Sequence, residues 1–190
     1  MNNKNKDIQV VAIIPARYRS NRFPGKPLAD INGKPMIQHV VERAAQVELL
    51  SRVYVATDNQ NIADVVRGFG GNVVMTREDH VSGSDRLAEA AEKIDISEQD
   101  VVVNIQGDQP FFHSEVIEQV AGPLLDDPML SMSTLIYKII RKEEINDPNH
   151  VKTVFDKDKY ALYFSRSAIP FQRNPEESAA PTYYKHLGFY

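Results

Sequence analysis

The chain has 190 residues, of which 42% are hydrophobic and 25% are charged, with 9 glycines and 11 prolines. This composition excludes a chain that is disordered, collagen-like or of low complexity, and the length is sufficient for one buried core. The net charge of −4 argues against a nucleic-acid coat protein, and the absence of cysteine excludes disulfides, thiolate metal sites and cysteine nucleophiles.

No apolar run approaches the roughly 20 residues of a membrane span. The polar N-terminus does not resemble a signal peptide. We therefore expect a cytoplasmic protein with neither nucleic-acid nor membrane partners. No linker rich in Gly or Ser divides the sequence, so we expect one domain over residues 1–190.

Strands and helices alternate along the first 125 residues. Short β-branched apolar runs predict buried strands, with Pro15 stopping the first of them, over 8–14, 52–56, 72–75 and 100–105. Apolar residues at helical spacing predict helices, the second capped by Asn59 or Asn61, over 35–50, 62–69, 84–94 and 114–125. The alternation predicts an α/β fold with a doubly wound, mostly parallel sheet.

The pattern changes near residue 130. Strand-like segments separated by loops follow, over 131–137, 151–155, 160–164 and 184–190. We expect them to form an antiparallel β extension on the sheet.

A basic loop follows the first predicted strand, at the edge where doubly wound sheets bind ligands. It has neither a dinucleotide-binding glycine fingerprint nor a Walker P-loop. Instead Gly25 allows close backbone approach, beside a polar set made of Arg17, Arg19, Ser20, Arg22 and Lys26. Composition alone favours a solvated basic loop, whereas the position after the first strand favours a polyphosphate site.

A second polar loop follows the predicted strand over 100–105 and carries Gln106 and Asp108. A carboxylate at a strand end can hold Mg²⁺ together with phosphate oxygens and water. The same aspartate can also cap a turn or the helix that follows. The two interpretations weigh equally on this residue alone, and the neighbouring basic loop favours the metal.

Six segments resemble, in order, the motifs of the 3-deoxy-manno-octulosonate (Kdo) cytidylyltransferases of lipopolysaccharide assembly. They are IPARYRSNRFPGKPL (14–28), SGSDR (82–86), NIQGDQP (104–110), DPNHVK (147–152), ALYFSRSAIP (161–170) and HLGFY (186–190). The first segment is the most specific, whereas SGSDR alone would be a weak signal. The resemblance spans nearly the whole chain.

The resemblance implies transfer of CMP from CTP to the anomeric hydroxyl of Kdo or of its 8-amino analogue, with release of pyrophosphate. It implies a catalytic set of Arg17, Lys26 and Asp108, in which Asp108 ligates Mg²⁺ and Lys26 balances charge on the departing pyrophosphate. Ser20 would also hold the triphosphate, and Arg22 is a weaker member of that set.

The remaining implied contacts divide between nucleotide and sugar. Arg77, Ser82 and Asp85 stand where the family reads cytosine and ribose, and the sugar contacts would be Gln106, Arg166, His186 and Tyr190. Four of these residues have a plainer alternative: Arg166 could pair with a carboxylate, His186 could be a core histidine, Asp85 could cap a helix, and Tyr190 could fray.

This chain departs from the family pattern at Ser84, where Thr is usual, and at Gln109, where Glu is usual. The family's further C-terminal segments, which imply a second metal carboxylate and the homodimer surface of the full-length form, do not follow Tyr190. A truncated chain and a naturally short relative both remain open. The alternatives are a nucleotidyltransferase of the same fold for another sugar, or a catalytically impaired nucleotide-binding fragment.

Overall fold

The computed structural model describes residues 8–19, 23–174 and 181–190. The chain divides into two compact units. Unit 1 comprises Met1–Ser133 together with Phe189–Tyr190, and unit 2 comprises Thr134–Gly188. That both units act as one domain stays a prediction.

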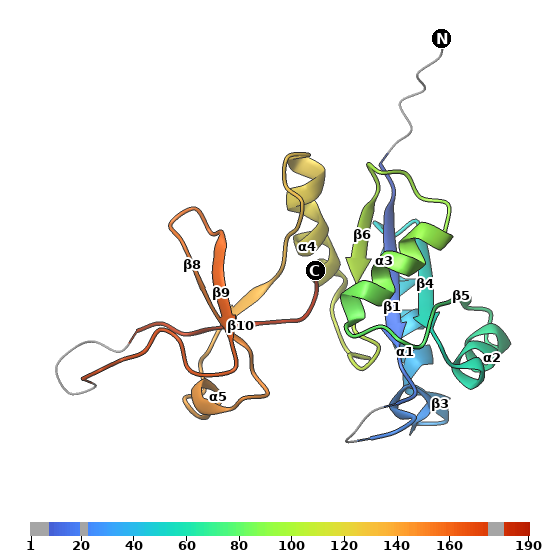
Figure 1. Ribbon diagram of the computed structural model, residues 1–190, viewed down its shortest axis with the longest axis horizontal. Helices are drawn as coiled ribbons and strands as arrows, with labels where there is room; N and C mark the ends of the chain where they lie inside the picture. Colours follow the sequence, from blue (N-terminus) through green and yellow to red (C-terminus); the bar gives the residue numbers. More distant parts are fainter. Residues whose placement is uncertain (1–7, 20–22, 175–180) are drawn as a thin grey trace, which may run out of the picture. The chain divides into compact units, whose positions relative to one another are not determined.

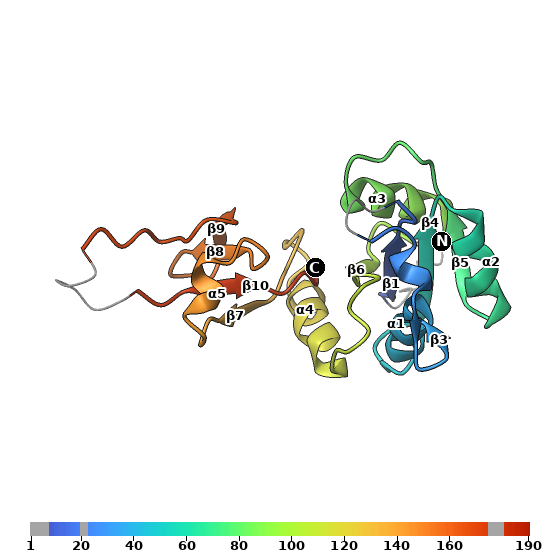
Figure 2. The same ribbon diagram turned by 90° about the horizontal axis from the view of Figure 1, so that it is seen from below.

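Unit 1 contains a parallel sheet with strand order β5-β4-β1-β6 (Figure 1). Its strands are β1 (Val10–Ala16), β4 (Arg52–Thr57), β5 (Asn72–Met75) and β6 (Val101–Asn104). Its helices are α1 (Met36–Ala44), α2 (Gln60–Gly68), α3 (Gly83–Lys93) and α4 (Ser114–Asp126). Figure 2 shows α3 on one face of the sheet and α1 on the other, so the predicted α/β fold is confirmed.

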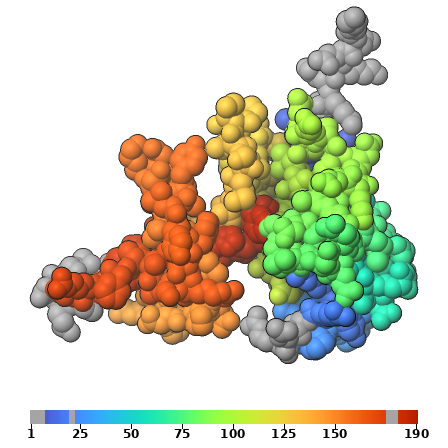
Figure 3. Space-filling model, viewed as in Figure 1, coloured from blue at the N-terminus to red at the C-terminus, as the bar shows by residue number. Residues whose placement is uncertain are grey.

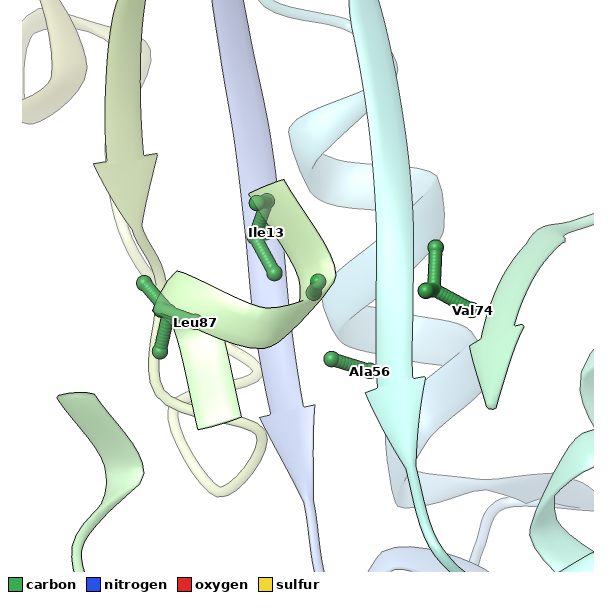
Figure 4. Close-up of a cluster of buried hydrophobic side chains, with 5 residues drawn as sticks. Ile13, Ala56, Val74 and Leu87 are labelled. Carbon is green, nitrogen blue, oxygen red and sulfur yellow. The ribbon is translucent and has the colours of Figure 1, made fainter. Parts of the chain in front are cut away.

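A shared apolar core joins the sheet to α3. Ile13, Ala56 and Val74 come from three adjacent strands and pack with Leu87 and Ala90 of α3 (Figure 4). Each is less than a tenth exposed. Because a buried Val, Ile or Leu side chain contributes about 1.5–3 kcal/mol, this cluster fixes α3 firmly over β1, β4 and β5.

Two helices of unit 1 begin at side-chain caps. The Asn59 side chain accepts the Ile62 N–H at 3.2 Å, so Asn59 rather than Asn61 caps α2. Ser82 and Asp85 form a reciprocal capping box at α3. Helix α1 ends at Ala44 instead of continuing to residue 50, because the chain there tightens into three-residue turns such as Val47 N–H to the Ala44 carbonyl.

Pro15 does not stop the first strand, which continues to Ala16. Pairing of β1 with β4 runs through Ala16, whereas pairing with β6 ends at Ile13 opposite Asn104. The Ile13 carbonyl points toward β6 and accepts the Ile105 N–H. Backbone groups two residues apart along a strand point to the same side, so those of Pro15 also point toward the β6 side. The ring nitrogen of Pro15 therefore faces the side where β6 has ended and no ladder bond is lost.

Two shorter features follow β1. A 3₁₀ turn, η1 (Lys26–Leu28), precedes a small hairpin of β2 (Asp30–Ile31) and β3 (Lys34–Pro35). Its Asn32–Gly33 turn has positive φ at both positions, 51° and 81°, as a two-residue hairpin turn requires.

A buried ion pair ties α3 to two strand ends. The fully buried Arg86 donates to an Asp58 carboxylate oxygen at 2.8 Å and to the Thr76 hydroxyl at 2.5 Å. Asp58 directly follows β4 and Thr76 directly follows β5. The guanidinium therefore holds the carboxyl ends of both strands against α3.

Unit 2 is an antiparallel sheet with strand order β7-β10-β8-β9. Its elements are β7 (Ile136–Lys138), α5 (Glu143–Asn146), β8 (Lys152–Phe155), β9 (Ala161–Ser165) and β10 (Tyr184–His186). The predicted antiparallel strands are thus present, but they form a separate sheet and do not extend the parallel one. Its first and last strands are shorter than predicted, since β7 begins at Ile136 and β10 ends at His186.

The chain turns at Gly188, whose φ of +77° favours glycine, and the last two residues belong to unit 1. The C-terminal residues, red in Figure 3, lie against the green segment that includes α3 and β6. Within the described ranges, no helix has both the length and the apolar character needed to cross a membrane.

Candidate active site

The strand order of unit 1 creates a switch point between β1 and β6. From β1 the chain proceeds to β4 and then β5 on one side, whereas β6 lies on the other side of β1. Ligands of doubly wound sheets bind beyond the carboxyl ends of the strands at such a point. The two loops predicted to carry the chemistry leave β1 and β6 there.

Lys26 and Asp108 meet at this switch point. The Lys26 Nζ lies 2.8 Å from Asp108 Oδ2, although the two residues are 82 positions apart in the sequence. Gly25, with φ of +71°, turns the chain into η1 and donates its N–H to the Tyr18 carbonyl at 2.8 Å. The Lys26 side chain is 37% exposed and that of Asp108 is 51% exposed, so both can exchange this pairing for a ligand.

Gly107 permits the close approach of the two loops, a role that the sequence analysis missed. A Cβ at this position would lie 3.0 Å from the Pro15 carbonyl oxygen. The neighbouring Gln106 is half-buried, and its carbonyl accepts the Gln109 N–H at 3.1 Å in a turn. A glycine between two candidate polar residues, just after a buried strand, was the available signal.

Arg17 directly follows β1. Its Nη2 is buried and has no hydrogen-bond partner among the described residues. A cationic donor that the surrounding protein leaves unsatisfied is suited to an anionic ligand. Ser20 and Arg22, the other predicted contacts of this loop, lie outside the described residues.

Ser82 and Asp85 serve as helix caps, as the plainer alternative for Asp85 predicted. The Asp85 carboxylate accepts the Ser82 hydroxyl at 2.8 Å and the Ser82 N–H at 2.9 Å. These hydrogen bonds are the main reason that the pKa of Asp85 is lowered, with smaller effects from the charges of His80 and Arg17. Arg17 is therefore near enough to this capping box to influence it.

Arg77 lies in the loop between β5 and α3. Its side chain is 70% exposed, and its Nε lies 3.4 Å from Asp79 and 3.9 Å from Glu89. Arg77, His80 and Asp85 line a cavity of about 630 Å³ between this loop and α3. Arg77 thus shares a cavity with one of the two other predicted nucleotide contacts.

Tyr190 belongs to unit 1 and contacts two of its elements. Its hydroxyl lies 3.3 Å from Ser84 Oγ at the start of α3, and its carbonyl accepts the Asn104 N–H at 2.7 Å. The Phe189 ring packs edge-on against Phe112, with centroids 5.5 Å apart. Tyr190 therefore joins the end of β6 to the start of α3.

Arg166 and His186, two of the predicted sugar contacts, belong to unit 2. The Arg166 guanidinium donates to the Pro148 carbonyl at 2.6 Å. The His186 ring lies 2.7 Å from Thr134 Oγ1 and packs edge-on against Phe164. Burial lowers the pKa of His186, so the ring is neutral near pH 7.

No group of three or more His, Cys, Asp or Glu side chains that could hold a metal ion occurs in the part of the chain that the structure describes. Asp108 is the carboxylate at the switch point. A single carboxylate is sufficient for the Mg²⁺ of a nucleotide-binding enzyme, because phosphate oxygens and water supply most of the other ligands.

Comparison with known proteins agrees with this geometry. A cytidylyltransferase family model matches residues 11–190. A curated 3-deoxy-manno-octulosonate cytidylyltransferase from Syntrophus aciditrophicus (strain SB) is 55% identical over 182 residues, which are 96% of this chain and 73% of the relative. An 8-amino-3,8-dideoxy-manno-octulosonate cytidylyltransferase from Shewanella sp. (strain ANA-3) is 52% identical over 184 residues, which are 96% of this chain and 74% of the relative.

A solved structure, that of a CMP:2-keto-3-deoxy-manno-octonic acid synthetase complexed with CTP, matches with a TM-score of 0.85 and 46% identity. The match covers 95% of this chain and 72% of that one. Both the sequence relatives and the solved structure are nucleotidyltransferases. The chain therefore belongs to the cytidylyltransferase family, among the enzymes that act on manno-octulosonate sugars.

Proposed function

We propose that this chain transfers CMP from CTP to the anomeric hydroxyl of Kdo or of its 8-amino analogue and releases pyrophosphate. The observation that carries the proposal is the pairing of Lys26 with Asp108 at the switch point, together with the buried Nη2 of Arg17 after β1, which has no hydrogen-bond partner among the described residues. The identities of 55% and 52% to enzymes for the two sugars support both substrates nearly equally.

In this proposal the basic groups bind and orient the triphosphate. Lys26, at the start of η1, meets the departing pyrophosphate, and Arg17 contacts the oxygens around the reacting phosphorus. The task is to stabilise negative charge that develops as the sugar oxygen attacks, which fixed cations do without reorganising. Ser20 and Arg22 would complete the phosphate contacts of the same loop.

Asp108 would hold Mg²⁺. When bound, the metal polarises phosphoryl oxygens and lowers the pKa of a nearby hydroxyl. In the structure the Asp108 carboxylate forms an ion pair with the Lys26 ammonium, with Oδ2 and Nζ 2.8 Å apart. A bound nucleotide would attract Lys26 to its phosphates, which leaves the carboxylate free for the cation.

The other predicted contacts sort by substrate. Arg77, Ser82 and Asp85 would recognise base and ribose around the cavity beside α3. Gln106, Arg166, His186 and Tyr190 would contact the sugar. The Arg166 guanidinium suits the sugar carboxylate because its fork binds both oxygens, whereas the neutral His186 suits a hydroxyl.

The product would serve lipopolysaccharide assembly. We place the reaction in the cytoplasm and expect the full-length form to be a homodimer.

Pyrophosphate release measures the reaction directly. We expect CTP with Mg²⁺ and either Kdo or 8-amino-Kdo to release pyrophosphate well above a control without sugar, and sialic acid to give only the control rate. A sialic acid rate equal to that of Kdo would favour another sugar, and no release with any sugar would contradict the proposal.

A further inference from the structure

The loop over residues 77–82, between β5 and α3, has one principal anchor. Its backbone forms no hydrogen bond to another backbone group in the described part of the chain after Thr76, whose N–H donates to the Thr57 carbonyl at 2.9 Å. Instead the Arg77 N–H donates to the two Glu89 carboxylate oxygens, at 3.0 and 3.3 Å. A single side chain of α3 thus replaces the strand partner that this loop lacks.

Glu89 makes further contacts with the same region. Its carboxylate contacts the His80 ring nitrogen and accepts the Lys93 ammonium at 2.6 Å. The His80 side chain is 5% exposed and that of Glu89 is 14% exposed, so the contact with His80 is shielded from water. Hydrogen bonds from Lys93 and from the Arg77 N–H hold the pKa of Glu89 to about 2, and the group is ionised at physiological pH.

The anchored loop faces the phosphate side of the candidate site. Glu78, between the two anchored residues, lies 2.6 Å from Arg19 of the basic loop. This exposed pair contributes little energy by itself, but it shows that the 77–82 loop reaches the basic loop after β1. The far end of the 77–82 loop is held by the Ser82–Asp85 capping box.

From this arrangement we infer that Glu89 is a positioning residue for CTP. Its carboxylate fixes the 77–82 loop against α3 and so sets where Arg77 and Ser82 meet the nucleotide. The Glu89 side chain also lines the cavity beside α3, and its inferred role is to hold the loop in place. The inference rests on the proposed function, because it assigns to the loop the recognition of the CTP base and ribose.

The test compares Glu89→Ala with Glu89→Gln and with Glu42→Ala as a matched control. Glu42 is also a helix glutamate in an ion pair, with Lys34 at 2.8 Å, but it lies on α1. Calorimetric titration with CTP and Mg²⁺ should show a Kd at least tenfold higher for Glu89→Ala, or about 1.4 kcal/mol. Glu89→Gln should show about a threefold increase, because its amide oxygen still accepts the Arg77 N–H, and Glu42→Ala should stay within twofold.

Two further measurements separate positioning from general stability. The KM for CTP should rise in Glu89→Ala while kcat stays within twofold, and hydrogen exchange at the Arg77 amide should accelerate at least tenfold. Failure of the wild-type chain to bind CTP would overturn the proposed function together with this inference. A wild-type chain that binds CTP and a folded Glu89→Ala variant of equal affinity would overturn the inference alone.

If Glu89→Ala does not fold, Glu89→Gln decides. An affinity at least threefold weaker supports positioning by Glu89, whereas an unchanged affinity overturns it. A fall in kcat with no change in CTP affinity would also overturn it, because that result would place Glu89 in the chemical step.

Discussion

Replacing Gly107 by alanine tests whether close packing of the two loops sets the position of Asp108. The new Cβ would lie 3.0 Å from the Pro15 carbonyl oxygen and 3.6 Å from side-chain carbons of Ile14 and Ile37. Pro15 cannot retreat, because β1 is paired with β4 on both sides of it. The loop with Gly107 must therefore move by about 0.4 Å to reach an ordinary contact of 3.4 Å.

Overpacking of this kind costs about 1–3 kcal/mol, and each kcal/mol lowers the midpoint of thermal unfolding by about 2–4 °C in a chain of this size. Since a misplacement of ~1 Å can cost ~10²-fold in rate, a shift of about 0.4 Å should reduce turnover roughly sixfold. Lys26 should lose part of its contact with the displaced Asp108.

The assays are thermal unfolding and pyrophosphate release, with Gly68→Ala as the control. Gly68 is the last residue of α2, where a Cβ would meet nothing within 4 Å. That variant should be at least as stable as the wild type, because alanine is the better helix former, with turnover unchanged. If Gly107→Ala behaved like Gly68→Ala in both assays, the close approach to Pro15 would not position Asp108.

Three other changes have defined outcomes. Lys26→Ala should weaken CTP binding at least tenfold, or about 1.4 kcal/mol, with the fold intact because the side chain is 37% exposed; equal calorimetric affinity would contradict a phosphate role. Asp108→Asn should abolish most of the Mg²⁺ dependence of CTP binding, and a wild-type response to Mg²⁺ would leave Asp108 as a turn residue only. Glu144 has its pKa lowered from 4.5 to about 2 by hydrogen bonds from Lys185 and then Arg141, so it stabilises the fold above pH 4.5 and this contribution is lost as the pH falls toward 2. Glu144→Gln should therefore lower the temperature of the unfolding midpoint at pH 7, and this midpoint should decrease less than that of the wild type between pH 4.5 and 2. An equal decrease in both proteins would contradict a stabilising role for ionised Glu144.

The parallel sheet was predictable from the sequence because its strands are apolar and two of the helices beside it, α2 and α3, begin at side-chain caps. The strand over 72–75 has the predicted bounds, and Asn59 caps the predicted helix. The exception at Pro15 depends on where β6 stops pairing, which the local sequence of β1 does not contain.

The strands β7 and β10 of unit 2 were predicted less accurately, because each has only three residues and none of these is buried. The residues before Ile136 include Met132, which is apolar yet 66% exposed, so the strand-like composition there does not report burial. Likewise the apolar ending Leu187–Tyr190 resembles a strand, but Gly188 turns it away from β10 and into unit 1.

The loops that carry Lys26 and Asp108 both follow the carboxyl ends of parallel strands, where doubly wound sheets bind ligands. This part of the site could therefore be predicted from the sequence. The hydrogen bonds from the Arg77 N–H to Glu89 could not be predicted in this way. By composition, a glutamate on a helix surface is an ordinary solvated residue. The position of Tyr190 was also inaccessible, because it depends on a return of the chain to the end of β6. Such contacts require the three-dimensional register of the sheet.

That return has a consequence for the order in which the protein is made. Unit 2 is an insertion in the sequence of unit 1, and the Asn104 N–H and the Phe112 ring receive their partners only when residues 189 and 190 have been synthesised. Closing a flexible loop of roughly 55 residues costs about 1.5 kcal/mol more than closing one of ten. A folded insertion removes this cost, since the Leu187 N–H donates to the Leu135 carbonyl at 3.0 Å and holds entry and exit together. Folding of unit 2 during translation would therefore lower the entropic cost of bringing Phe189 and Tyr190 back to the end of β6.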